Sequence, residues 1–225
     1  SKICIKKDDI NMDEDITIIN ESTRYEKTKN FFINNKNKLI SIFLVIILLL
    51  CGYFLYKDFE KKNKIKLSNK YNIATANFIA GNKLKVEGDL IEIINKKDTA
   101  YSPLALYFLV DNKIISEKKK VNELFDIVIN ETSLEKEIKN LIIYKKALYN
   151  ADFESENNFI EMLKPITNSE SIWKSHGLYL LGEYFYSKNE KQKSKDFFSQ
   201  IIKLEDSNSE IKIEAQKRLN RDFSE

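Results

Sequence analysis

The chain contains one long run without a charged side chain, LISIFLVIILLLCGYFLY at residues 39–56, which is bounded by Lys38 and Lys57. As an α-helix this run would be about 27 Å long, which nearly matches the roughly 30 Å hydrocarbon core of a bilayer. Lysines at both ends and tyrosines near the C-terminal end are residue types that favour the membrane surface. We therefore predict one transmembrane helix at residues 39–56, in contact with the lipid bilayer.

Two other interpretations of this run fit less well. One is a buried core helix of a soluble domain. The other is a cleavable signal peptide, which would start nearer the N-terminus and end at small residues, whereas this run begins only at Leu39 and continues into YFLYKDFEKK. A signal anchor that is retained accounts best for the run.

Charge does not orient the predicted span, because basic residues flank it almost equally. Five precede it between positions 18 and 38, and six follow it between positions 57 and 77, namely Arg24, Lys27, Lys29, Lys36 and Lys38, then Lys57, Lys61, Lys62, Lys64, Lys66 and Lys70. Neither side of the span therefore has the excess of lysine and arginine that would mark it as cytoplasmic.

The residues before the span are mostly polar, and those after it show helical periodicity. We expect residues 1–38 to form a short flexible tail in which only residues 31–33, FFI, look helical, and Met12 would serve as the first residue of such a tail. Beyond the span, apolar residues recur with a period of 3.6, and short polar breaks separate the segments. These breaks fall at residues 81–83, 95–100, 116–118, 130–133, 150–155, 166–171, 187–190 and 205–209.

Composition favours an all-α fold. Only five Gly and two Pro occur in 225 residues, too few for the many turns of a β-sandwich or barrel. Segments of about 11 to 18 residues joined by short turns predict antiparallel helical hairpins. Ser102 and Pro103 predict a helix start, with Ser102 as the N-cap and Pro103 at the first helical position.

A repeat of helical hairpins is indicated near the C-terminus. Residues 175–206 show the order of small and large side chains typical of a tetratricopeptide unit, with Leu178, Leu181, Gly182 and Phe185 followed by Ser194, Phe198 and Ile201. Ala147 precedes Gly182 and Ala215 follows it at nearly the same interval. This spacing predicts a degenerate array with a period of about 34 residues, an α-solenoid. The alternative is an ordinary amphipathic hairpin.

The whole layout resembles a known family, the tetratricopeptide-like ancillary subunit of the bacterial Sec translocon. The resemblance runs through FFINNKNKLI from residue 31, YSPLALY from residue 101, and finally Trp173, the Leu-Gly-Glu triplet at 181–183 and KNEKQKS at 188–194. The chain departs from the family at Ser194, where alanine is usual, and at Asn189 and Glu190, where a Gly-Asp turn is usual. The unit at residues 138–166 has diverged further.

The resemblance implies a bacterial inner-membrane protein with a cytoplasmic N-terminus and a periplasmic C-terminal domain. We predict four parts: the tail at residues 1–38, the span at 39–56, membrane-proximal helices at 57–100 and a tetratricopeptide-like domain at 101–225. The partners that the resemblance implies are translocon subunits, periplasmic chaperones or emerging polypeptides. The alternative function is a structural scaffold for envelope assembly or cell division that does not contact the translocon.

No residue pattern points to catalysis, a cofactor or a metal. The two cysteines are Cys4 in the tail and Cys51 in the apolar run, and the single histidine, His176, has no partner at metal or catalytic spacing. No phosphate-binding glycine loop, dinucleotide fingerprint or HExxH motif occurs. All but three of the 37 basic residues are lysines, which argues against nucleic-acid recognition. We expect a binding protein, not an enzyme, without catalytic, cofactor or metal residues.

The predicted working surface lies on the helix that contains Gly182. With Leu178, Leu181 and Phe185 turned inward, a separate stripe of side chains shares one face, namely His176, Tyr179, Glu183 and Tyr186. In tetratricopeptide arrays this face lines the concave groove, so we predict these four residues as a partner-binding groove. The alternative is that the two tyrosines pack on a neighbouring hairpin.

Overall fold

A computed structural model of the chain describes residues 11–223, and this part consists of helices without any strand. The helices are α1 (Asn11–Ile79), α2 (Lys83–Asn95), α3 (Tyr101–Asp111), α4 (Lys118–Glu131), α5 (Lys136–Asn150), α6 (Glu156–Thr167), α7 (Lys174–Ser187), α8 (Lys191–Lys203) and α9 (Ser209–Asp222). The all-α prediction is confirmed, and each of the eight predicted breaks overlaps a connection between consecutive helices. The chain forms two compact units that divide between Asn63 and Lys64.

Helix α1 includes the apolar run and extends beyond it in both directions. Among the described residues this is the one helix long and apolar enough to cross a membrane. Residues 40–59 are all exposed, so the alternative of a buried core helix disagrees with the structure. At the C-terminal end, Gly81 has a φ of +88°, a conformation that glycine adopts without strain, and α1 ends at Ile79 just before it.

The expectation that only residues 31–33 of the tail are helical is wrong. Residues 11–38 all belong to α1, and they contain neither glycine nor proline. A helix already formed at the apolar run can extend through such a sequence, because each added residue gains one backbone hydrogen bond. The first ten residues of the predicted tail, including Cys4, lie outside the described part of the chain.

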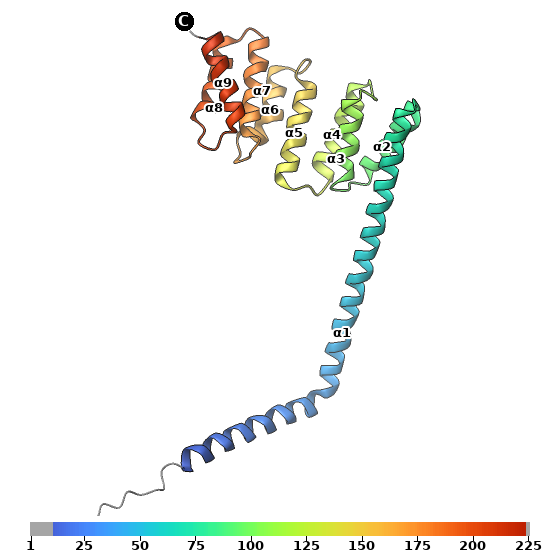
Figure 1. The fold of residues 1–225 in the computed structure, drawn as a ribbon, viewed down its shortest axis with the longest axis vertical. Coiled ribbons are helices and arrows are strands. Elements are labelled where there is room, and N and C mark those ends of the chain that lie inside the picture. The colour runs from blue at the N-terminus through green and yellow to red at the C-terminus, as the bar shows by residue number, and fades with distance from the viewer. Residues whose placement is uncertain (1–10, 224–225) are drawn as a thin grey trace, which may run out of the picture. The chain divides into compact units, whose positions relative to one another are not determined.

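Helices α2 to α9 follow one another as a row of packed helices (Figure 1). Each helix in this row contacts the next along the chain, and α2 also contacts α4, α5 contacts α7, and α7 contacts α9. The last part of α1 joins this unit through Leu67, Tyr71 and the fully buried Ala74. Helix α2 also packs on α3 and α4 across residues 96–100, and the predicted division at residue 100 stays a prediction.

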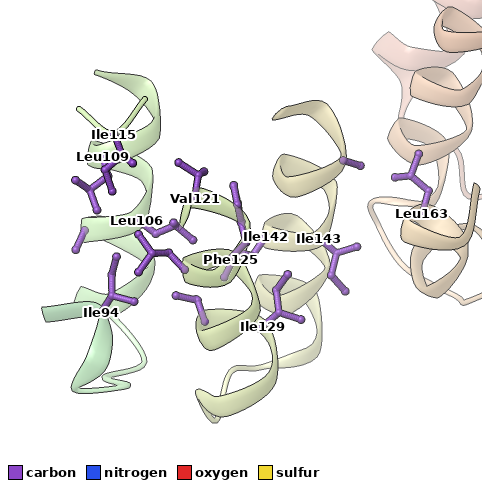
Figure 2. Close-up of a cluster of buried hydrophobic side chains, with 14 of the residues drawn as sticks. Ile94, Leu106, Leu109, Ile115, Val121, Phe125, Ile129, Ile142, Ile143 and Leu163 are labelled. Carbon is purple, nitrogen blue, oxygen red and sulfur yellow. The ribbon is translucent and has the colours of Figure 1, made fainter. Parts of the chain in front are cut away.

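Two apolar clusters form the interior of this unit. The larger extends from the end of α1 to α7, and Figure 2 shows how side chains of α3, α4 and α5 meet between these helices, among them Leu106, Val121, Phe125 and Ile142. The smaller joins α7, α8 and α9 through Leu178, Phe198, Ile201 and Ala215. All five core residues predicted for the repeat, Leu178, Leu181, Phe185, Phe198 and Ile201, are buried, which confirms their assignment.

The predicted close contact at Gly182 is also confirmed. A Cβ atom at this position would lie 2.6 Å from Cε1 of Phe198, a distance that real Cβ atoms essentially never show. Ser194 is fully buried, and its hydroxyl donates a hydrogen bond of 2.8 Å to the carbonyl oxygen of Gly182. In the α7–α8 pair the Phe198 ring therefore packs directly against the backbone of Gly182, and a side chain at position 182 would have to displace the ring.

The N-terminus of α3 is capped by a different residue from the one predicted. Helix α3 begins at Tyr101, and the Asp98 carboxylate accepts hydrogen bonds from the backbone N–H groups of Ala100 and Tyr101. Ser102 is not the N-cap, because it is fully buried and its hydroxyl lies 3.1 Å from the carbonyl oxygens of Ile93 and Ile94 on α2. An aspartate one turn earlier satisfies the free N–H groups instead.

Candidate functional site

The structure places the four predicted groove residues on α7 and leaves each of them half-buried. Glu183 and Tyr186 contact α9. The Arg218 guanidinium forms a bidentate ion pair with Glu183, at 2.6 Å from Nε to Oε1 and 3.0 Å from Nη2 to Oε2. The same guanidinium lies 4.3 Å from the ring centre of Tyr186, and the Phe223 ring lies 6.0 Å from that of Tyr186. Glu183 and Tyr186 therefore help to stabilise the packing of α9 on α7.

The other two groove residues contact different neighbours. The Tyr179 ring lies 5.3 Å from the Phe198 ring of α8. His176 lies 4.9 Å from the Trp173 ring and 5.9 Å from the Tyr144 ring of α5, and burial lowers the pKa of His176 below its usual value. The four residues thus do not form one open face. Packing on neighbouring helices accounts for Tyr179 and Tyr186, and partner binding by the stripe stays a prediction.

A cleft that was not predicted from the sequence lies among the later helices of the row, beside α5 and α7. It has a volume of about 430 Å³ and lies between the start of α5, the loop before α7 and the loop between α8 and α9. Its lining residues are Glu137, Glu170, Ser171, Ile172, Lys174, Leu204, Glu205 and Asp206. Two of the three segments are loops without periodicity. The available signal was the repeat itself, because Ser171 and Glu205 stand one repeat period apart in equivalent turns.

Hydrogen bonds hold the wall of this cleft in place. The Ser171 hydroxyl donates to Oε2 of Glu137 at 2.7 Å and accepts from the amide of Asn140, a largely buried residue, at 2.9 Å. The ammonium group of Lys136 donates to the carbonyl oxygen of Glu170 at 2.8 Å. The loop before α7 is therefore tied to the start of α5, and the cleft is already formed in the free chain.

The charge at the cleft is opposite to that of the chain. The whole chain has a net charge of +3, whereas Lys174 is the one basic side chain among four acidic ones that line the cleft. None of these carboxylates, Glu137, Glu170, Glu205 and Asp206, forms an ion pair with a lysine or arginine in the described part of the chain. Among residues 11–223, no three His, Cys, Asp or Glu side chains are grouped so that they could share a metal ion.

An apolar side chain stands beside these charges. Ile172 is 66% exposed although it lies in the hydrogen-bonded loop next to Trp173. An exposed isoleucine flanked by carboxylates that form no ion pair can bind a peptide segment that carries both an apolar and a positively charged side chain. Because the carboxylates are spread along the cleft, the positive charges of the ligand would be spread as well. Comparison of the chain with protein-family models, curated proteins and solved structures gives no match.

Proposed function

We propose that this chain is a single-span membrane protein whose tetratricopeptide-like array of helical hairpins binds other proteins. The observation that carries this proposal is that five inter-element bonds span 33 to 35 positions along the chain, beside others that span 28 to 37 positions. The five bonds join Glu87 to Lys120, Lys136 to Glu170, Glu137 to Ser171, Ser175 to Asn208, and Glu183 to Arg218. Contacts that repeat with one period along the chain are expected when each unit packs on the next in the same way.

The burial of small residues supports the same period. Ala147, Gly182 and Ala215 follow one another at nearly equal intervals, and all three are buried, on α5, α7 and α9 respectively. The tetratricopeptide unit has about 34 residues and uses small side chains where its two helices approach. Arrays of this kind present extended surfaces that bind peptides and proteins.

The cleft is the part of the array that we assign to partner binding. It is preformed, it contains an exposed isoleucine, and its carboxylates have no ion-pair partner within the described chain. A preformed site requires little ordering when it binds. The partner would supply a positively charged, extended segment, whose charges the cleft attracts more strongly than the lysine-rich remainder of the surface does.

The setting of the protein is proposed from the sequence resemblance. The residues that resemble the ancillary subunit of the Sec translocon lie around the span and on α3, α7 and α8. With them we propose an inner-membrane adaptor that has its C-terminal domain in the periplasm and recruits chaperones or emerging polypeptides beside the translocon. Such an adaptor needs no chemistry of its own.

Crosslinking from the intact membrane tests this function. A photoreactive residue is placed at Ile172 in the cleft, and the control carries it at Glu123, an exposed residue of α4. We expect translocon subunits, chaperones or nascent chains to be captured from position 172, and the double variant Glu170→Lys and Asp206→Lys to lose them while Glu123→Lys does not. Equal capture from both positions would reject the cleft. Capture of only envelope-assembly or division proteins would favour the structural scaffold.

A further inference from the structure

The segment that follows the apolar run directly is strongly basic. Residues 57–66, KDFEKKNKIK, carry five lysines and two carboxylates, and all of them belong to α1. Tyr56 and Phe59 at its start are each 64% exposed. Exposed aromatic rings next to lysines are characteristic of the layer where a membrane helix meets lipid headgroups.

Helix geometry places several of these lysines on one face. Lys57, Lys61 and Lys64 are separated by four and then three residues, so their side chains lie along one stripe of α1. At the rise of an α-helix the stripe is roughly 10 Å long. The headgroup layer of one leaflet is about 5 to 8 Å thick, and a flexible lysine can reach a phosphate from slightly above it.

The two acidic side chains do not neutralise the segment. Lys57 pairs with Glu60 at 3.3 Å and Lys62 pairs with Asp58 at 2.7 Å, and each pair lies on the exposed surface of the same helix. Exposed pairs of this kind contribute little free energy and exchange readily for another anion. Because the segment has five lysines and only two carboxylates, its net charge is positive whichever lysines the carboxylates pair with.

We propose that residues 57–66 bind the headgroups of anionic phospholipids in the leaflet adjacent to Tyr56. The span keeps the lysines at the bilayer surface, so lipid phosphate is the anion present there at high local concentration, and each lysine near an anionic surface strengthens the interaction about fivefold. The inference rests on the proposed membrane anchoring. It adds a lipid class to the protein partners of the helical array.

Native mass spectrometry of the full chain in detergent micelles tests this site, with phosphatidylglycerol and phosphatidylcholine as the two probes. The test variant replaces Lys57, Lys61, Lys62 and Lys64 by Gln. The control variant removes the same charge from four exposed lysines of other helices, Lys119, Lys191, Lys203 and Lys217. We expect the wild type and the control to retain phosphatidylglycerol in preference to phosphatidylcholine, and the test variant to lose at least tenfold in affinity for phosphatidylglycerol.

Two results would overturn the lipid site: equal retention of both lipids by the wild type, or equal loss in both variants. Far-UV circular dichroism of both variants checks that they keep the helix content of the wild type. Membrane anchoring is checked separately by alkaline extraction of membranes that contain the wild type. A chain released by alkali would reject the anchor, whereas a retained chain without lipid preference would reject the lipid site alone.

Discussion

At the scale of single residues, the contact between α7 and α8 depends on the missing side chain at Gly182. Any Cβ there would meet the ring of Phe198, which is itself fully buried. Ser194 fits the same contact because its hydroxyl bonds to the Gly182 carbonyl, which satisfies a buried polar group at a position where alanine is usual in the resembling family.

Replacing Gly182 by Leu should therefore lower the free energy of unfolding by roughly 1 to 3 kcal/mol through overpacking. Urea denaturation measures the change. Gly88→Leu is the matched control, because Gly88 is also helical but a Cβ atom added to it would have no neighbour within 4 Å, so this change should have little effect or stabilise slightly. Equal stability of both variants and the wild type would place Gly182 outside the core.

The turn between α7 and α8 depends on the conformation of Asn189. Its φ of +61° is in the left-handed region, where asparagine is tolerated and glycine is favoured. We expect Asn189→Ala to cost about 1 kcal/mol and Asn189→Gly to be neutral. Chemical denaturation of both variants checks this, and an alanine variant as stable as the glycine variant would contradict it.

His176 should make stability depend on pH. Its pKa is lowered in the folded state because burial disfavours the charged imidazolium. The unfolded chain then binds the proton more readily, so the stabilisation is complete above the unfolded pKa of about 6.5 and is lost as pH falls through the folded pKa. His176→Gln should remove this part of the dependence. Because the chain has one histidine, the difference between the two proteins in denaturation curves on either side of that unfolded pKa isolates it.

At the scale of helices, α9 packs on α8 and α7, and two of the residues predicted to form a groove, Glu183 and Tyr186, contribute to its contact with α7. Arg218 of α9 is 12% exposed at its side chain and touches both Glu183 and Tyr186, while Phe223 packs beside them. Periodicity assigned the four residues of the stripe to a face of α7 separate from Leu178, Leu181 and Phe185. It could not show that a later helix covers that side, because the covering helix is specified by residues a whole repeat further along the chain.

The triple variant Tyr179, Glu183 and Tyr186→Ala should consequently loosen α9 and lower the free energy of unfolding by roughly 2 kcal/mol or more. Hydrogen exchange should show the loss of protection first in α9, with α2 to α5 nearly unchanged. Lys217→Ala, on the exposed side of α9, serves as the control. If the triple variant is as stable as the wild type but no longer binds its protein partners, the result would support a partner-binding groove and contradict the packing role.

The remaining differences between sequence and structure have the same physical origin. Breaks between helices were predictable because polar residues interrupt the helical period, and the core of α7 and α8 followed from that period. The cleft was not predicted, since it forms where the start of α5 meets two loops that come from later parts of the chain. Asp98 rather than Ser102 caps α3 because Ser102 is drawn into the contact with α2, a tertiary effect that local preference does not include.

At the scale of the whole molecule, the apolar run of α1 and the helical array differ in the chemistry of the surfaces that they expose. Residues 40–59 expose almost only large apolar side chains up to Tyr56, which water does not favour, whereas the surfaces of α2 to α9 are rich in lysine and carboxylates. The exposed run was predictable from the sequence alone, because 18 consecutive residues carry no charge. Its orientation was not, because the lysines on its two sides are nearly equal in number.

The orientation is the last prediction. If residues 39–56 span the inner membrane with residues 57–225 in the periplasm, alkaline phosphatase fused after Glu225 should be active, because this enzyme matures only outside the cytoplasm. A fluorescent protein that folds only in the cytoplasm should give signal when fused before Ser1 and none when fused after Glu225. Deleting residues 39–56 should abolish phosphatase activity, which controls for export by another route. Signal from the cytoplasmic reporter at the C-terminus would reverse the topology and remove the helical array from the periplasm, and with it the proposed contact with periplasmic chaperones.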